Sequence, residues 1–207
     1  MNVSDHQNLT INTGHDILKA LKIKNFRIFF IGQGISFVGT WSQAVAISWL
    51  VWTLTESGWW LGFTNFAIQI PILLFGLLGG FLADKYSRRP LLIIFQILCM
   101  SQAIALSILA IIGVIKLWHI IALSLLLGTV YAIEFPLRFT FIMDMVSKKN
   151  LLNAISLNSA AMHLSRIMGP VIAGFIINKY SEPTCFIFNA FTFIFLIAAL
   201  FAIDKKP

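Results

Sequence analysis

Long apolar runs alternate with short polar stretches along almost the whole chain. Six runs are long enough to cross a membrane, because a helix needs about 20 apolar residues to span a hydrocarbon core of about 30 Å. These runs cover residues 26–53, 59–83, 90–115, 117–141, 154–177 and 184–203. They are continuous, whereas the strands of a membrane barrel alternate apolar and polar positions. The pattern predicts an all-α membrane protein with six transmembrane helices, flanked by polar segments at 1–25 and 204–207.

The composition agrees with a membrane protein and argues against several other classes. Hydrophobic residues make up 58% and charged residues 11% of the 207 residues, a mixture too apolar for one soluble core. The net charge of +7 comes from short basic bursts with no continuous basic face, which argues against nucleic-acid binding. Cys99 and Cys185 lie inside apolar runs without metal-ligand spacing. Because no catalytic triad or nucleotide-binding loop is found either, we expect no enzyme, no metal site, no cofactor and no use of ATP.

Lysine and arginine residues are distributed unequally among the polar segments. If the N-terminus is cytoplasmic, eleven of these residues lie in cytoplasmic segments and two, Lys116 and Lys179, lie outside. Positive charge is enriched on the cytoplasmic side of membrane proteins. We therefore expect both termini to lie in the cytoplasm.

Two of the expected cytoplasmic connections carry much of this charge. The tight loop at 79–92 joins the second and third runs and contains Asp84, Lys85, Arg88 and Arg89. The longest connection, 142–153, contains Asp144, Lys148, Lys149, Leu151 and Leu152. Because this connection mixes charged and apolar residues, we expect it to form a short helix that lies on the membrane surface.

Glu134 and Arg138 are ionisable residues inside the fourth run, where charge is costly without a partner or a water-filled cavity. Their spacing of four residues places both on one helix face. Two interpretations remain open. Either the pair neutralises itself near the cytoplasmic end, or Glu134 faces a central cavity and takes up protons or binds a cationic substrate. Pro136 lies between them and is expected to bend the helix.

His163 and Arg166 lie one helical turn apart near the middle of the fifth run. An arginine at this depth must face protein or water, because lipid offers it no partner. It either binds an anionic group or hydrogen-bonds to helix carbonyls. His163 either takes part in proton coupling, since histidine titrates near neutral pH, or packs as a neutral side chain.

Small and uncharged polar residues mark two further helix faces. A stripe of small residues on the fifth run is formed by Ser165, Gly169 and Ala173. Such spacing lets a neighbouring helix approach closely, and Pro170 in the same run removes a backbone hydrogen bond. One face of the first run carries Gln33, Thr40 and Gln43. We expect that face to line a cavity.

Two stretches resemble signatures of the major facilitator superfamily. The run Gly80-Phe-Leu82-Ala83-Asp84-Lys85-Tyr-Ser87-Arg88-Arg89 resembles its loop between helices two and three, Gly-x-Leu-Ala-Asp-Arg-x-Gly-Arg-Arg, and departs from it at Lys85 and Ser87. The run Gly169-Pro170-x-x-Ala173-Gly174 is similar to the Gly-Pro-x-x-Gly-Gly element of antiporters in that superfamily. Residues 46–57 and the run Ser165-Arg166-Ile-Met-Gly169-Pro170 resemble its enterobactin-exporter and macrolide-efflux branch.

The resemblance covers about residues 20–205 and implies one six-helix half, a 3+3 inverted repeat, of a fold built from two such halves. It implies efflux of a small solute across the bacterial inner membrane, coupled to the proton gradient. Asp84 is expected to bond to a facing helix, while Lys85, Arg88 and Arg89 close the inner gate. We expect the chain to need a second half or a homodimeric partner. The alternative is a truncated remnant that does not transport.

Overall fold

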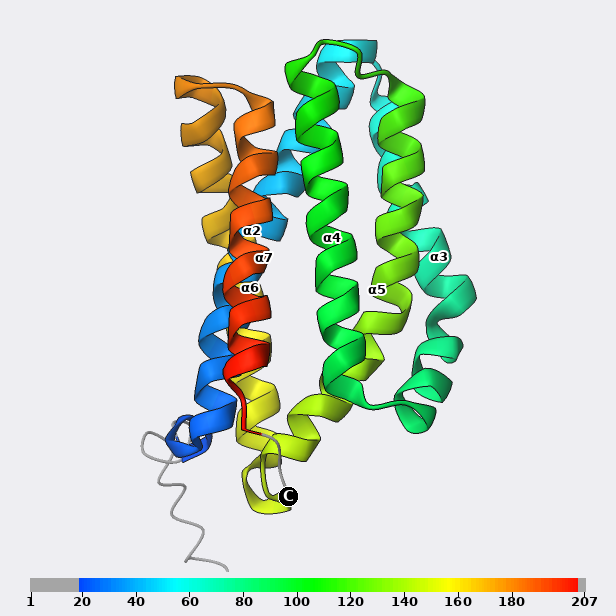
Figure 1. Ribbon diagram of the computed structural model, residues 1–207. Coiled ribbons are helices and arrows are strands. Elements are labelled where there is room, and N and C mark those ends of the chain that lie inside the picture. The colour runs from blue at the N-terminus through cyan, green and yellow to red at the C-terminus, as the bar shows by residue number, and fades with distance from the viewer. Residues whose placement is uncertain (1–18, 205–207) are drawn as a thin grey trace, which may run out of the picture.

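The computed structural model describes residues 19–204, except for the side chains of residues 78–80 and 82–84. A short 3-10 helix, η2 (Lys19–Lys22), precedes six long helices (Figure 1). These are α2 (Lys24–Thr55), α3 (Gly58–Lys85), α4 (Arg88–Ile111), α5 (Leu117–Met145), α6 (Lys148–Lys179) and α7 (Glu182–Ala202). All six are long and apolar enough to cross a membrane, and residues 19–204 contain no strand. The predicted fold class is therefore confirmed. The predicted terminal segments fall largely on residues 1–18 and 205–207, outside the described residues.

The connection between α5 and α6 is much shorter than predicted. The expected surface helix at 142–153 is wrong, because α5 continues to Met145 and α6 begins at Lys148. Val146 and Ser147 join the two helices with extended backbones. Met145 and Val146 are buried in one apolar cluster at this end of the bundle. Packing inside the protein thus extends both helices beyond the ends of the apolar runs.

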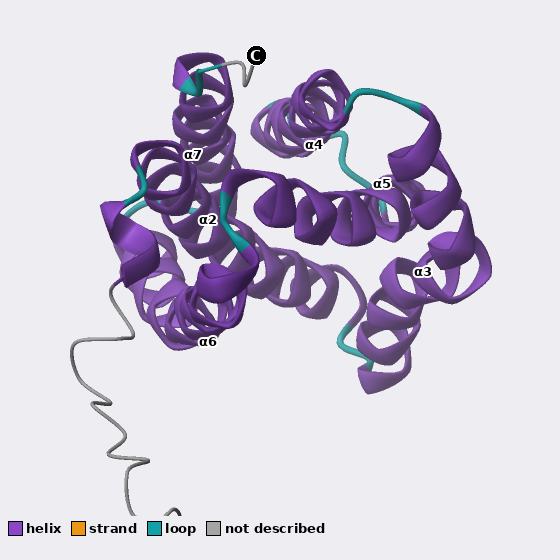
Figure 2. Cartoon of the chain, turned by 90° about the horizontal axis from the view of Figure 1, so that it is seen from below, coloured by secondary structure: helices purple, strands orange, loops and turns teal. Residues whose placement is uncertain are grey.

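The six helices form two groups of three, which Figure 2 shows side by side. α2 packs against α6 and α7, α5 packs against α3 and α4, and contacts between α4 and α7 join the groups. If α2, α3 and α4 are exchanged with α5, α6 and α7, respectively, the same set of helix contacts results. Exchanged helices run in opposite directions because they are three spans apart. The packing is therefore that of the expected 3+3 inverted repeat.

Two glycines occupy equivalent close contacts in the two groups. Where α6 meets α2, a side chain at Gly169 would collide with Trp41, and Ser42 Oγ donates a hydrogen bond of 3.0 Å to the Gly169 carbonyl oxygen. Where α5 meets α3, a side chain at Gly128 would collide with the carbonyl oxygen of Ile68. Glycine at both places lets the helix backbones approach closely, as at other helix contacts in membranes.

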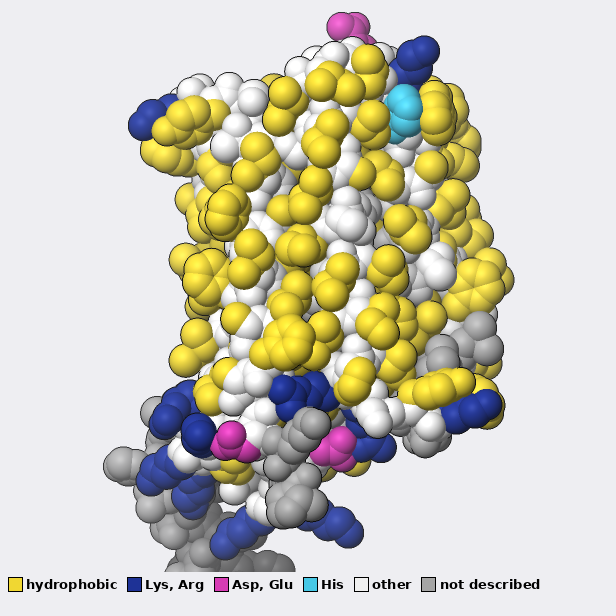
Figure 3. All heavy atoms as spheres, in the orientation of Figure 1, with side chains coloured by type: hydrophobic (Ala, Val, Ile, Leu, Met, Phe, Trp, Pro, Cys, Tyr) yellow, Lys and Arg dark blue, Asp and Glu magenta, His cyan; other side chains and the backbone are white. Residues whose placement is uncertain are grey.

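The surface has an apolar middle and a basic end. Figure 3 shows hydrophobic side chains over most of one face, with lysine and arginine side chains gathered near η2 and the α3–α4 and α5–α6 connections. Burial also differs between helices. In α3 and α6, 17% of the most apolar 18-residue segment is buried, against 44–50% in the other four helices. The equivalent helices α3 and α6 therefore each leave a broad face uncovered by the rest of the described chain.

Replacing Gly169 and Gly174 of α6 by alanine should have opposite effects on stability. Gly169→Ala adds a methyl group to the contact with α2, and such overpacking costs about 1–3 kcal/mol. Among the described residues, nothing lies within 4 Å of a Cβ built at Gly174. Gly174→Ala should therefore gain about 0.5–1 kcal/mol from better helix propensity. Thermal unfolding in detergent, followed by circular dichroism, measures both effects. Equal melting temperatures for the two variants would contradict the tight α2–α6 contact.

Candidate functional site

A cavity of about 310 Å³ lies between the two groups of helices. Most of its wall comes from α2, α3 and α5, with single residues from α4, α6 and α7. Five amide side chains contribute to the lining: Gln33, Gln43, Asn65, Gln69 and Gln96. The charged residues that line it are Glu134 and Arg138, and aromatic rings and aliphatic side chains complete the wall. A mostly apolar cavity with a few convergent polar groups is typical of a small-molecule site.

The polar face predicted for the first span lines this cavity. Gln33, Thr40 and Gln43 of α2 all contribute to its wall. Gln33 and Gln43 are almost fully buried, so their amides face the interior of the bundle and not the surrounding lipid. The three residues therefore lie on one face of α2, as their spacing in the sequence predicts, and that face points toward the cavity.

Glu134 and Arg138 form a buried ion pair on α5. The Arg138 guanidinium contacts Glu134 Oε1 through both Nη2 and Nε, the latter at 3.1 Å. Gln96 of α4 donates a hydrogen bond of 2.8 Å to the same oxygen. The guanidinium also lies 5.0 Å from the ring centroid of Phe37 and 5.4 Å from that of Phe135. Aromatic faces and a carboxylate thus stabilise the arginine together.

The sequence left two alternatives, a self-neutralising pair or a glutamate that faces the cavity. The structure contains both features, because Glu134 and Arg138 form the ion pair and also line the cavity. Its carboxylate is only partly satisfied. Glu134 Oε2 and Gln96 Oε1 are buried and have no hydrogen-bond partner within the described part of the chain. A buried acceptor without a donor is unfavourable, so Oε2 is an atom to which a proton, a water molecule or a ligand donor can bind.

Gln43 is held by a second polar network. Its Nε2 donates to Gln102 Oε1 of α4 at 3.0 Å, and its Oε1 accepts a hydrogen bond of 2.8 Å from Asn189 Nδ2 of α7. Thr192 Oγ1 donates in turn to Asn189 Oδ1 at 3.1 Å. The contacts fix the orientation of the Gln43 amide at the cavity wall. Gln96 was not predicted from the sequence, where its only signal is that it is one of two amides, with Gln102, in the third apolar run.

The candidate residues of α6 divide between two faces. Ser165, Gly169 and Ala173 are buried, as the small-residue stripe predicts. Pro170 is half-buried and Gly174 is exposed, so the residues of the antiporter-like run do not all lie on one buried face of the helix. His163 and Arg166 are exposed and are not among the described residues that line the cavity. The Arg166 guanidinium lies 4.8 Å from the ring centroid of Trp41, which does line it.

The charged residues between α3 and α4 lie at the basic end of the bundle. Gly80 and Asp84 belong to the last turns of α3, and their side chains are outside the description. Lys85 is exposed. Arg88 forms an ion pair with Asp144 at the end of α5, and Arg89 Nη2 donates a hydrogen bond of 2.8 Å to the Phe201 carbonyl oxygen of α7. The two arginines thus join the start of α4 to the ends of two neighbouring helices.

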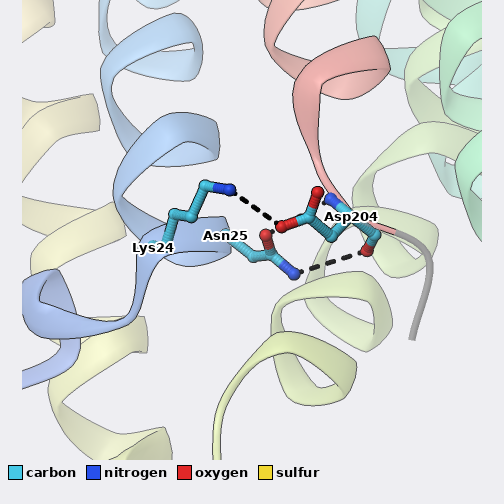
Figure 4. A network of polar contacts seen from close by, with 3 residues as sticks. All are labelled: Lys24, Asn25 and Asp204. Carbon is cyan, nitrogen blue, oxygen red and sulfur yellow. Dashed lines mark hydrogen bonds and ion pairs between the residues drawn. The ribbon is translucent and has the colours of Figure 1, made fainter. Parts of the chain in front are cut away.

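A third contact at this end joins α2 to the C-terminal end of α7 (Figure 4). Lys24 Nζ forms an ion pair of 3.0 Å with Asp204 Oδ2, and Asn25 Nδ2 donates a hydrogen bond of 3.4 Å to the Asp204 carbonyl oxygen. The charged side chains of Lys24 and Asp204 are exposed, so the ion pair adds little to stability. It nevertheless places the end of α7 beside the start of α2.

Six spanning helices in an inverted repeat, with a few polar groups converging on a cavity, are the architecture of one half of a major facilitator transporter. Comparison with known families gives the same class. The chain belongs to the family described as Transmembrane secretion effector, whose model matches residues 17–206. The expected membership of the superfamily is therefore confirmed, and the chain is an integral, multi-pass membrane protein.

Relatives of this chain are named as transporters. The Staphyloferrin A transporter of Staphylococcus aureus is 32% identical over 189 residues, which cover 87% of this chain and 47% of that protein. The Uncharacterized MFS-type transporter YfiS of Bacillus subtilis is 22% identical, over 88% of this chain and 43% of its own length. The Enterobactin exporter EntS of Shigella flexneri is 24% identical, over 73% of this chain and 37% of its own length. The chain spans about half the length of the curated relatives it matches.

Removing one member of the buried ion pair should be far more damaging than removing both. Arg138→Met leaves the Glu134 carboxylate buried without its counter-charge, a change that typically costs about 3–5 kcal/mol. The double variant Glu134→Gln with Arg138→Met removes both charges and should recover most of that loss. Thermal unfolding of the three proteins in detergent measures the coupling. If the single and double variants melt together, the two side chains are not coupled energetically.

Proposed function

We propose that this chain forms one half of a transporter that exports a small solute across the membrane. The observation that carries the proposal is the cavity that is lined by the charged residues Glu134 and Arg138 inside a bundle of apolar helices. Charged side chains at membrane depth mark the pathways of solutes and ions. The family match and the relatives named as transporter or exporter support this function. The similarity of residues 169–174 to the antiporter element favours export.

A second six-helix unit completes the transporter, either another copy of this chain or a separate half. The broad uncovered faces of α3 and α6 support this proposal. In the superfamily fold the solute site lies between two such halves near the middle of the membrane. The second unit therefore packs against the uncovered faces of α3 and α6.

The proposed transporter lies in the bacterial inner membrane. The basic end of the bundle faces the cytoplasm, and both chain termini lie on that side. The enrichment of lysine and arginine at that end supports this orientation. The residues Lys85, Arg88 and Arg89 then surround the inner mouth of the pathway. Contacts of Arg88 with α5 and of Arg89 with α7 support a role in closing that mouth. Asp84 is proposed to bond to a helix of the second half.

Proton uptake by Glu134 drives the proposed export. Arg138 and Gln96 both bind Glu134 Oε1, whereas Oε2 has no partner among the residues described and is the atom that a proton joins. Protonation removes the negative charge and weakens the attraction for Arg138. The cavity then gains one unit of net positive charge. Proton binding and the electrostatics of the solute site are thereby linked through one pair of side chains.

Replacing Glu134 by glutamine should abolish proton-driven transport, because glutamine keeps the size of glutamate but takes up no proton. Since this variant leaves Arg138 without its counter-charge, circular dichroism checks that it is folded, and the double variant Glu134→Gln with Arg138→Met is assayed beside it. Staphyloferrin A is the probe, and its release from loaded proteoliposomes is measured with and without an inward proton gradient. The wild-type chain should release it faster with the gradient. Glu134→Gln should show only the gradient-independent rate. Glu56→Gln is the matched control, since Glu56 is exposed at the end of α2, and it should behave as wild type.

Two outcomes would contradict different parts of this proposal. Equal gradient dependence in the wild type and in Glu134→Gln would refute the coupling role of Glu134. If the folded wild-type chain released neither staphyloferrin A nor enterobactin, the result would exclude transport of these solutes by copies of this chain alone.

Chemical crosslinking in native membranes should trap pairs of six-helix units. We expect a band at twice the mass of the chain for a homodimer, or a band with a second helical protein for a separate half. The physical reason is the exposure of α3 and α6, whose faces need protein or lipid to cover them. Crosslinking and solute release are measured on the same membranes. Monomers alone, in membranes where release is observed, would rule out the need for a second half.

A further inference from the structure

Arg166 carries a positive charge far from both ends of α6. The helix runs from Lys148 to Lys179. At 1.5 Å per residue, Arg166 lies roughly 27 Å along the axis from the first residue and roughly 20 Å from the last. Those distances are too long for the side chain to reach the membrane surface by extending along the helix. The guanidinium therefore stays at the depth of the bilayer core.

The Arg166 side chain has no carboxylate partner in the described part of the chain. It is exposed, and none of the ion pairs or hydrogen bonds of residues 19–204 involves it. The alternative considered from the sequence, bonding to helix carbonyls, is therefore not what the structure contains. An arginine that faces hydrocarbon is strongly unfavourable. This face of α6 must meet water or a polar group.

Arg166 lies beside the cavity because of its contact with α2. Its guanidinium is 4.8 Å from the ring centroid of Trp41, a residue of the cavity wall. The close contact at Gly169 fixes the position of Trp41 against α6. Met162, one helical turn before Arg166 on the same side of α6, also lines the cavity. The guanidinium thus stands at the edge of the cavity between α2 and α6.

The charges around the cavity do not cancel. Glu134 and Arg138 neutralise each other within their ion pair. Arg166 then gives the site a net positive charge when the cavity is empty. The Trp41 ring lies beside the guanidinium, whose N–H groups have no hydrogen-bond partner in the described part of the chain. These N–H groups match the two oxygens of a carboxylate, which arginine binds through two parallel hydrogen bonds.

We propose that Arg166 binds a carboxylate group of the solute and makes the cavity selective for anionic solutes. The inference rests on the proposed transport function, because the carboxylate is assigned to the cargo of that cavity. It adds the chemical class of the cargo and the residue that recognises it. Trp41 acts as a positioning residue, which holds the guanidinium at the cavity edge.

Binding of a matched pair of probes to the purified full chain tests this assignment. The probes are citrate and its neutral triamide, and the chain is held in nanodiscs of zwitterionic lipid so that no anionic headgroup competes. Isothermal titration calorimetry measures both affinities. Citrate should bind at least about tenfold more tightly than the triamide, since hydrogen bonds to a charged group are stronger than neutral ones. Arg166→Gln should remove this preference and leave triamide binding unchanged.

Two further variants separate the role of Arg166 from general charge effects. Lys179→Gln removes one positive charge from the end of the same helix, where Lys179 also lies beside aromatic rings, and should keep the full preference for citrate. Arg166→Lys keeps the charge but loses the planar fork, and should retain part of the preference. Light scattering measures the oligomeric state of each variant, which should not change.

Several results would overturn the proposal. These are a wild-type chain that binds citrate no better than the triamide, an unchanged preference in Arg166→Gln, and an equal loss in Lys179→Gln. Dissociation of the oligomer in Arg166→Gln with the citrate preference intact would assign Arg166 to the contact with the second half instead. The release assay in proteoliposomes is scored separately. Transport without anion preference refutes this inference alone, whereas anion preference without transport refutes only the proposed function.

Discussion

The hydrocarbon core of a membrane offers no hydrogen-bond partner, so polar groups that the chain carries into it must be satisfied within the protein. The backbone meets this requirement by forming helices from end to end. Buried side chains meet it across helix contacts: Gln96 of α4 binds Glu134 of α5, and Gln43 of α2 binds Asn189 of α7. The polar groups that a solute pathway needs therefore also determine how the helices pack.

These contacts make the six helices one mechanical unit. Buried amides join α2, α4 and α7 in the interior, while charged contacts at the basic end join α4 to α5 and α7. Glycines in the equivalent α2–α6 and α3–α5 contacts hold α6 against α2 and α5 against α3. Alternating access in this superfamily is largely a rigid rocking of one half against the other. A bundle joined at its interior and at one end suits a movement of that kind.

The sequence predicts local features of this fold better than contacts between distant residues. The number of spans follows from the apolar runs, because bilayer thickness dictates their length. The Glu134–Arg138 pair follows from a spacing of four on one helix. Its partner Gln96 is 38 positions from Glu134, and Asn189 is 146 positions from Gln43. Apolar runs do not specify which helix faces meet, so these contacts required the structure. The start of α6 at Lys148 was missed for the same reason, since packing against α5 extends it.

The two arginines of the cavity region differ in what they require when water leaves the site. Arg138 has its counter-charge in Glu134 without any solute, as part of a neutral pair. Arg166 has Trp41 on one face but no counter-charge in the described chain, so an empty cavity must remain wet around it. Removing that water strengthens electrostatic interactions and makes an unpaired charge costly. In the proposed cycle, closure around an empty site is therefore unfavourable. An anionic solute that supplies the missing charge relieves this cost, which links occupancy of the cavity to the movement that closes it.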